Sequence, residues 1–264
     1  HLSREDRVHK ILDAGCDQLG GESCPDVVVS LVESGRLSEE RIDRSARRIL
    51  REKFVLGLFD DPFVDPDAAE SLVGTAELRA LGAHAQRRSC TLLKNGDVER
   101  GAALPLQEGG RVYLVGVDAE EAAPYATVVD KPADADVAIV RLAAPYERRP
   151  TGLERYFHAG SLDFSDEELR EVREVMDAVP TVVDVKLERP IILTKLNEQA
   201  AAVVGTYGAS DSALLDVLFG REPPGGRLPF ELPSSMDEVR EQRSDVPSDT
   251  ANPLYPIGHG LSYP

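Results

Sequence analysis

Residues that bind metals or form covalent cross-links are scarce in this sequence. Tryptophan is absent, and the 264 residues include three cysteines and two methionines. Three cysteines are too few for a disulfide framework, although Cys16 and Cys24 flank a glycine-rich loop and leave one pairing open in an oxidising compartment. No histidine or cysteine stands near them at metal-ligand spacing, which argues against zinc. We expect no metal and no cofactor, and we interpret Cys16, Cys24 and Cys90 as small packing residues.

Long apolar segments and an excess of positive charge are also lacking. No apolar run approaches the ~20 residues that a membrane-spanning helix needs. The 47 acidic residues outnumber the 30 basic ones and give a formal charge of −17. Binding to nucleic acid or to an anionic membrane depends on Lys and Arg. We therefore exclude both kinds of partner and interpret the acidic excess as a solvated surface.

The first residues carry no targeting signal. Residues 1–7 have neither the basic start nor the apolar stretch of a signal peptide. The chain does not begin with methionine, so we expect it to begin inside a longer product. Its compartment, cytoplasmic or secreted, stays open, and so does the oligomeric state, with a homo-oligomer as one alternative.

Residues 1–60 have the pattern of helices joined by short loops. Ser3 and Ser38 are positioned as N-caps, and Pro25 stands in a first helical turn. The third predicted helix carries an apolar stripe that we expect to be buried. The stripe consists of Ile42, Ala46, Ile49, Leu50 and Phe54. A stretch rich in proline and aspartate follows, and we interpret residues 61–75 as a domain linker.

From residue 76 to residue 264 the pattern changes to short β-branched runs that alternate with helices. The runs Val112–Val117, Val137–Leu142 and Val182–Leu187 are each bounded by turn residues. This alternation predicts an α/β fold with a mainly parallel sheet that is covered on both faces.

The tail after Gly220 is rich in proline and glycine but retains apolar residues. Leu232, Ile257 and Leu261 are among them, and they predict an ordered segment that wraps over the sheet. His259 stands between two glycines, and we interpret it as a structural hydrogen-bonding residue rather than as a general base.

Short motifs occur in order along nearly the whole chain. They are LDAGCD at residues 12–17, RIDRSARRIL at 41–50 with its extension to residue 60, and SCTLLKN at 89–95 followed by LPL at 104–106. Later motifs lie at residues 208–220, 224–229 and 256–263. Together these motifs resemble those of family 3 glycoside hydrolases.

The resemblance implies a (β/α)8-type barrel joined to an α/β sandwich. It assigns residues 1–60 to the C-terminal end of the barrel and residues 76–264 to the sandwich. It also implies a retaining exo-β-glycosidase, with a β-glucosidase favoured, in which two carboxyl groups flank the glycosidic bond. The family's nucleophile is an aspartate in an Asp-Trp-type motif, and this sequence has no tryptophan. We expect the nucleophile on an N-terminal barrel portion, in a separate chain or a further segment, and this chain alone to be inactive.

The resemblance places the other carboxyl group, the acid/base, on a sandwich loop, for which residues 143–164 are the candidate. One subgroup has its acid/base two positions before a Pro-Tyr pair, and that position here is Ala143. Another subgroup has it a few residues before a Leu-x-Leu turn, to which residues 161–164 are a fair counterpart. The second alignment favours Glu154, with Glu147 as the alternative, and leaves open that neither acts.

Neighbouring polar side chains are candidates for binding the glycoside or oligosaccharide substrate. Arg155 and His158 lie in the same loop as the candidate acids. Asp17 and Glu22 follow the end of the predicted barrel, where loops face the active-site mouth in barrel enzymes. For Asp17 a structural role, in which it accepts hydrogen bonds from nearby backbone amides, stays open.

Two other classes of function are alternatives to a glycosidase. The sandwich alone could be a non-catalytic carbohydrate-binding or interaction module, although the barrel helices would then expose an apolar face. A nucleotide-binding α/β protein is disfavoured, because the run Val112–Val117 is followed by Asp-Ala-Glu and not by a G-x-G-x-x-G motif.

Overall fold

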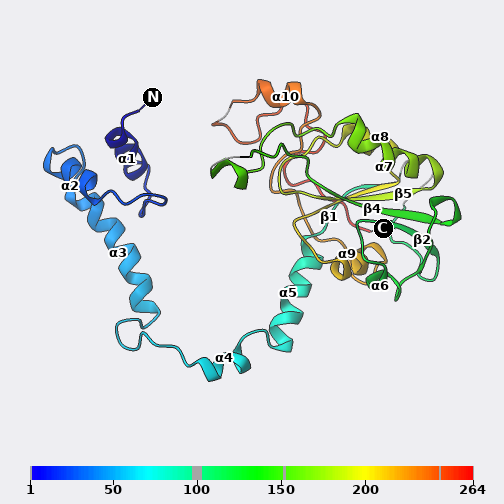
Figure 1. The fold of residues 1–264 in the computed structure, drawn as a ribbon, viewed down its shortest axis with the longest axis horizontal. Coiled ribbons are helices and arrows are strands. Elements are labelled where there is room, and N and C mark those ends of the chain that lie inside the picture. Colours follow the sequence, from blue (N-terminus) through cyan, green and yellow to red (C-terminus); the bar gives the residue numbers. More distant parts are fainter. Residues whose placement is uncertain (1, 97–102, 151–152, 244, 264) are drawn as a thin grey trace. The chain divides into compact units, whose positions relative to one another are not determined.

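The chain divides into two compact units, His1–Val73 and Gly74–Pro264. The computed structural model describes residues 2–96, 103–150, 153–243 and 245–263, and the side chains of residues 153 and 154 lie outside this description. The described part of unit 1 is helical (Figure 1). Its helices are α1 (Arg4–Asp13), α2 (Pro25–Glu33), α3 (Glu39–Val55) and α4 (Pro66–Leu72).

Serine caps begin α1 and α3 and a proline begins α2, as the sequence predicts. The Ser3 hydroxyl accepts from Asp6 N at 3.1 Å, and the Ser38 hydroxyl accepts from Arg41 N at 3.2 Å. Pro25 is the first residue of α2. These residues suit the first helical turn, where backbone amides have no partner within the helix.

Unit 1 has a small apolar core between α1 and α2. The core contains Val8, Leu12, Cys24, Leu31 and Leu37. The buried Arg41 guanidinium lies beside it and donates to Leu12 O at 2.8 Å and to Cys16 O at 2.9 Å. Because a buried cation is costly without partners, these bonds hold the loop after α1 against α3.

The predicted burial of the apolar stripe on α3 is wrong for most of its length. Ile42 is half-buried and Ala46 is exposed. Ile49, Leu50 and Phe54 are 37%, 43% and 66% exposed. The residues of α3 that are buried lie in its first two turns. In its last turn Phe54 contacts the Phe59 ring, with the centroids 4.6 Å apart, and stays exposed.

The three cysteines are free thiols. Cys24 and Cys90 are buried, as expected for packing residues, whereas Cys16 is exposed. Burial raises the pKa of the Cys90 thiol to about 12, so this thiol stays protonated at neutral pH.

Unit 2 is an α/β sandwich around a six-stranded sheet with the order β1-β6-β5-β4-β2-β3. The strands are β1 (Thr91–Asn95), β2 (Arg111–Val115), β3 (Thr127–Val128), β4 (Val137–Ala143), β5 (Thr181–Lys186) and β6 (Ala202–Thr206). β1 is antiparallel to β6, and all other neighbouring strands are parallel. The predicted α/β fold with a mainly parallel sheet is confirmed.

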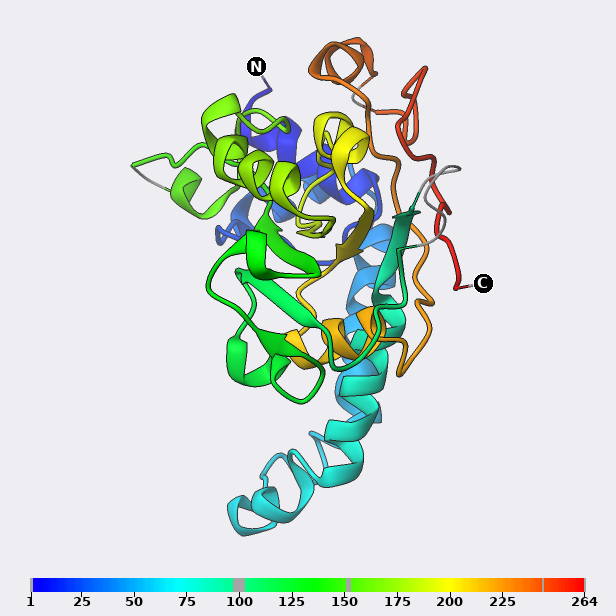
Figure 2. The ribbon, with the colours of Figure 1, turned by 90° about the vertical axis from the view of Figure 1, so that its right-hand side faces the viewer.

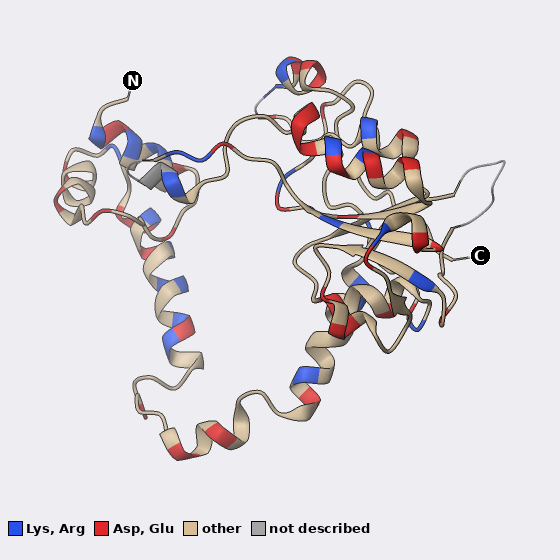
Figure 3. Ribbon diagram, turned by 45° about the vertical axis from the view of Figure 1, so that its right-hand side comes forward, with Lys and Arg blue, Asp and Glu red and all other residues tan. Residues whose placement is uncertain are grey.

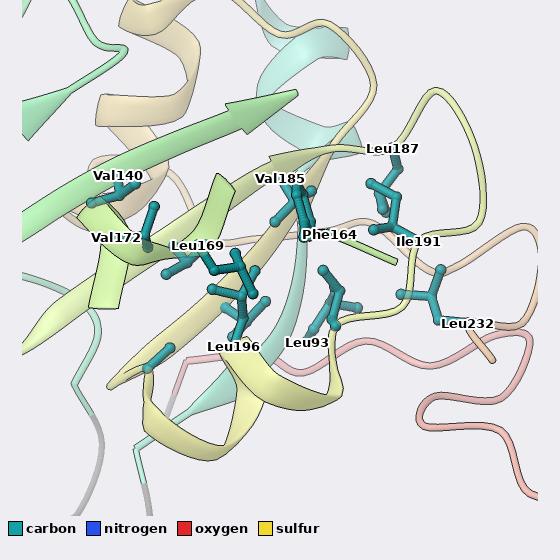
Figure 4. Close-up of a cluster of buried hydrophobic side chains, with 14 of the residues drawn as sticks. Leu93, Val140, Phe164, Leu169, Val172, Val185, Leu187, Ile191, Leu196 and Leu232 are labelled. Carbon is teal, nitrogen blue, oxygen red and sulfur yellow. The ribbon is translucent and has the colours of Figure 1, made fainter. Parts of the chain in front are cut away.

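Helices cover both faces of this sheet. The helices of unit 2 are α5 (Ala76–Ser89), α6 (Ala119–Ala122), α7 (Asp166–Ala178), α8 (Thr194–Gln199), α9 (Asp211–Leu218) and α10 (Met236–Glu241), with the 3-10 turns η1 (Pro132–Asp134) and η2 (Leu153–Tyr156). α7 and α8 pack on one face, and α6 and α9 pack on the other, with α5 against α9 (Figure 1). Figure 4 shows the first of these cores, where strand residues meet side chains of α7 and α8.

The central strand β5 is buried along its length because both of its faces are covered. Successive side chains of a strand point to opposite faces, so Val183 and Val185 join the core beneath α7, and Val182 joins the opposite core. Asp184 shares the side of Val182 by the same alternation. A carboxylate therefore lies within an apolar layer.

α7 follows the candidate loop and begins where the sequence predicts. Ser165 and Glu168 form a reciprocal capping box, which satisfies two amides of the first turn. Leu169, Val172 and Val175 face the core. Acidic and basic residues are interspersed along α7, as they are along α3 (Figure 3).

The tail is ordered, as predicted, and runs beside β1 (Figure 2). Leu232 pairs with Tyr255, and Leu261 N donates to Leu92 O at 2.7 Å. His259 Nε2 lies 2.8 Å from Leu93 O, which confirms its structural role. The predicted anchoring by the Ile257 and Leu261 side chains is wrong, since they are 56% and 37% exposed; at Leu261 the backbone makes the attachment.

Candidate active-site loop

The candidate loop leaves the sheet at the carboxyl end of β4. It connects β4 to α7, and the end of β5 lies beside its start, since Ala143 pairs with Lys186. The carboxyl ends of parallel strands are the usual place for ligand sites in α/β folds. Side chains that follow β4 and β5 are thus brought to one edge of the sheet.

A backbone bridge folds the loop back on itself. Glu147 N donates to Ala159 O at 2.9 Å in an antiparallel bridge. Next to it the rings of Tyr146 and His158 stack with their centroids 4.0 Å apart and their planes 16° apart. The structure therefore brings together Glu147 and His158, two of the predicted site residues.

The last residue of β5, Lys186, and Glu188 just beyond it hold His158 in place. His158 Nδ1 lies 3.2 Å from Glu188 Oε2, and Lys186 Nζ lies 2.5 Å from Glu188 Oε1. The hydrogen bond from Lys186 lowers the pKa of the Glu188 carboxyl, and the charges of Lys186 and His158 add to this effect. Partial burial of Glu188 acts in the opposite direction but does not outweigh them. Glu188 stays ionised and orients the imidazole. Neither Lys186 nor Glu188 was predicted as a site residue. Lys186 lies near the end of the predicted run Val182–Leu187 and Glu188 directly follows it, and this position at a strand end was the available signal.

Glu147 is exposed at the rim of a hollow of about 350 Å³. Asp163 and Glu168 line the same hollow, and Lys195 Nζ lies 3.7 Å from Asp163 Oδ2. Carboxylate oxygens accept hydrogen bonds, so this hollow presents acceptors suited to the hydroxyl groups of a polar ligand.

The other half of the loop contains Glu154 and Arg155. Glu154 lies in η2, and its side chain lies outside the described residues. The Arg155 guanidinium carbon lies 4.6 Å from the centroid of the exposed Tyr156 ring. A catalytic role for Glu154 and a sugar contact for Arg155 stay predictions.

Asp17 and Glu22 belong to unit 1, where both have cationic partners. Asp17 accepts from Ser45 Oγ at 2.7 Å and from Arg48 Nη1 at 3.1 Å. The hydrogen bond from Ser45 contributes most to lowering the pKa of the Asp17 carboxyl, and the hydrogen bond from Arg48 adds to it. Desolvation raises this pKa but does not outweigh them. Glu22 pairs with Arg4 at 3.2 Å. Asp17 therefore has side-chain partners, in place of the backbone amides considered as its alternative, and sugar binding by either residue stays a prediction.

A buried ion pair lies beneath the loop edge of the sheet. Asp184 is fully buried, and Arg141 Nε lies 2.7 Å from its Oδ2. Arg141 also pairs with Asp211 and donates to Ala209 O at 2.7 Å. Neither oxygen of Asp184 has an aligned hydrogen bond among the described residues. Burial therefore raises the pKa of the Asp184 carboxyl to about 6, although the charge of Arg141 opposes this.

The described part of the chain offers neither a metal-binding cluster nor a membrane-spanning helix. His, Cys, Asp and Glu side chains form no group of three there that could hold a metal ion. None of the helices there has the length and apolar character required to cross a membrane.

Comparison with known proteins identifies relatives of this chain. Residues 119–263 match the family model described as "Glycosyl hydrolase family 3 C-terminal domain". Probable beta-glucosidase C of Aspergillus flavus is 49% identical over 265 residues, which are 100% of this chain and 42% of that protein. The periplasmic beta-glucosidase/beta-xylosidase of Dickeya chrysanthemi is 40% identical over 99% of this chain and 40% of its own length. The chain thus spans about two fifths of the length of these relatives.

A solved structure shows the same fold. The beta-glucosidase from Listeria innocua in complex with isofagomine superposes with a TM-score of 0.68, over 98% of this chain and 44% of that protein. The two sequences are 21% identical, so this similarity concerns the fold alone.

Proposed function

The chain belongs to glycosyl hydrolase family 3, and on this premise we propose that it is the C-terminal part of a retaining exo-β-glycosidase acting on β-glucosides. The names of the relatives at 40% to 49% identity support this substrate class. The observation that carries the proposal is the loop after β4, which presents Glu147 beside a hollow at the carboxyl edge of the sheet.

In the proposed reaction this chain supplies one of two carboxyl groups. Glu154 is the assigned acid/base, with Glu147 as the alternative, and an aspartate nucleophile on a barrel portion lies about 5–5.5 Å from it. The acid gives its proton to the glycosidic oxygen while the nucleophile attacks the anomeric carbon. The resulting carboxylate then takes a proton from water, which releases the sugar from the nucleophile.

The neighbouring side chains are assigned to substrate binding. His158, oriented by Glu188, and Arg155 would contact sugar hydroxyls from the loop. Asp17 and Glu22 would do so from unit 1.

A barrel portion is the proposed partner of unit 1. Leu50 and Phe54 are 43% and 66% exposed on α3, and an exposed apolar surface of this kind usually marks an interface. The relatives contain more than half of their length outside the aligned region, which is enough chain to provide that cover.

Hydrolysis of an aryl β-glucoside by the intact protein, with the barrel portion and this chain together, tests the proposal. Glu154→Gln is expected to lower kcat by about 10²–10⁴-fold, and azide is expected to restore turnover with formation of a glycosyl azide, because azide attacks without a general base. Glu147→Gln tests the alternative, and Glu198→Gln on α8 is the control.

Specific outcomes would contradict these assignments. If the intact wild-type protein leaves aryl β-glycosides uncleaved, the proposed activity is wrong. If it is active and both glutamine variants keep full activity, the acid/base lies elsewhere. Saturable sugar binding by this chain, together with an inactive intact protein, would favour a carbohydrate-binding module.

A further inference from the structure

The Arg189 guanidinium donates to four backbone carbonyl groups of the candidate loop. Nη1 lies 2.7 Å from Pro145 O, 3.1 Å from Ala159 O and 3.3 Å from Ser161 O. Nη2 lies 2.8 Å from Gly160 O. Arginine suits such a cluster because its planar head carries five N–H donors in a fixed arrangement. One side chain thereby holds both arms of the loop, the arm that leaves β4 and the arm that returns to α7.

Two of these four residues, Ala159 and Gly160, lie against Glu147. Ala159 O, which Arg189 approaches, also accepts from Glu147 N at 2.9 Å. Gly160 has a φ of +85°, and a Cβ built on it would lie 2.4 Å from Glu147 Cδ. The Glu147 side chain therefore lies directly against this glycine. Its position depends on where the backbone of residues 159–161 is held.

Arg189 itself lies in the short bend after β5, between two buried residues. Leu187 is 3% exposed, and its N donates to Thr206 O at 2.7 Å. Ile191 is fully buried on the other side of Arg189. The loop is therefore attached to a bend whose flanking residues, Leu187 and Ile191, are buried in the core of unit 2.

We propose that Arg189 is a positioning residue that fixes the loop around Glu147, and with it this candidate acid/base carboxyl, at the edge of the sheet. Its effect on catalysis rests on the proposed function, whereas its hold on the loop is a property of this chain alone. The two can be measured separately.

Limited proteolysis tests the hold on the loop. Arg148 and Arg155 are exposed trypsin sites within the loop, and trypsin cuts after the backbone opens locally. In Arg189→Met we expect cutting at these sites to be roughly tenfold faster, with Arg189→Lys between this variant and wild type. Arg221→Met removes an arginine that donates to Pro124 O at 3.3 Å elsewhere in unit 2, and it should leave loop cutting unchanged.

Two proteolysis results would overturn the proposal. One is equal cutting of wild type and Arg189→Met within the loop. The other is faster cutting spread equally over arginines outside the loop, because this would report loss of the whole fold.

Two aryl β-glucosides then test the catalytic consequence in the intact protein. Phenol leaves poorly without a proton, whereas 2,4-dinitrophenol leaves without one. Arg189→Met is expected to lower kcat/KM for the phenyl glucoside by about 10–100-fold and to leave the dinitrophenyl glucoside close to wild type. Equal losses on both substrates would contradict a positioning role for the acid. An inactive wild-type protein would contradict the proposed function instead, and proteolysis would still decide the role of Arg189.

Discussion

Asp184→Asn removes an ionisable group from the interior of unit 2. Burial displaces the pKa of this carboxyl from 3.8 to about 6 in the folded state. At about 1.4 kcal/mol for each pH unit of displacement, ionised Asp184 costs the folded state about 3 kcal/mol. Asparagine has nearly the same shape and no charge, and Arg141 keeps Asp211 as a partner.

The sign of the pH dependence follows from proton binding. Below pH 3.8 Asp184 is protonated in both the folded and the unfolded state. The folded state then bears no cost of a buried charge at Asp184, so stability is at its full value. As the pH rises through 6 the folded state holds the proton longer than the unfolded state does, so stability is lost. We expect the wild type to lose about 3 kcal/mol relative to Asp184→Asn between about pH 4 and pH 7.5.

Urea unfolding followed by tyrosine fluorescence measures this difference. All seven tyrosines lie at residue 113 or later, so the signal reports unit 2. Asp136→Asn serves as a control of opposite sign, because hydrogen bonds from Arg111 lower the pKa of Asp136 below 3.8. This variant should lose stability relative to wild type as the pH rises towards 3.8, and the difference should stay constant between about pH 4 and pH 7.5. A difference between wild type and Asp184→Asn that stays constant with pH would refute the reasoning.

Two more variants test packing and assembly. Gly226→Ala would place a Cβ 2.2 Å from Thr91 Oγ1 and 2.4 Å from Ser89 O, and we expect the free energy of unfolding of unit 2 to fall by about 1–3 kcal/mol in the same urea assay. Gly82→Ala on α5, where a Cβ meets nothing within 4 Å, should not be destabilised. Equal effects of the two substitutions would contradict the packing argument. Phe54 is 66% exposed, so Phe54→Glu should leave thermal unfolding of this chain unchanged. The same variant should weaken binding of the barrel portion to this chain roughly tenfold or more. Unchanged binding would place the interface elsewhere.

Local features of the fold could be predicted because their causes are local. Ser3, Ser38 and Ser165 cap helices through bonds to residues three positions away, so a short stretch of sequence contains both partners. The short helices α4, α8 and α10 were not predicted, because six or seven residues give too little periodicity. The antiparallel direction of β1 depends on where the chain enters the sheet, and the composition of the strand does not encode this.

The candidate site was predictable only in part for a related reason. Glu147 and His158 belong to one segment, so a search of that segment found both. Glu188 and Arg189 follow β5, and they reach the loop because β4 and β5 are neighbours in the sheet. Strand order is set by long-range packing, which a pattern along one segment does not record. The stripe of α3 shows the same limit, since its apolar pattern predicts burial, whereas Phe54 is 66% exposed in this chain.

The tail beside β1 bears on how this protein avoids aggregation. An uncovered edge strand offers free amide and carbonyl groups to any extended peptide. Here Leu261 N donates to Leu92 O and Gly226 N donates to Cys90 O, so the chain occupies with its own last residues the place that a foreign strand would take. The opposite edge, β3, is two residues long and offers little to pair with. Truncation of the tail before Leu261 would therefore leave β1 as an unpaired edge strand that is prone to aggregation. A fusion partner added beyond the tail would leave that edge protected.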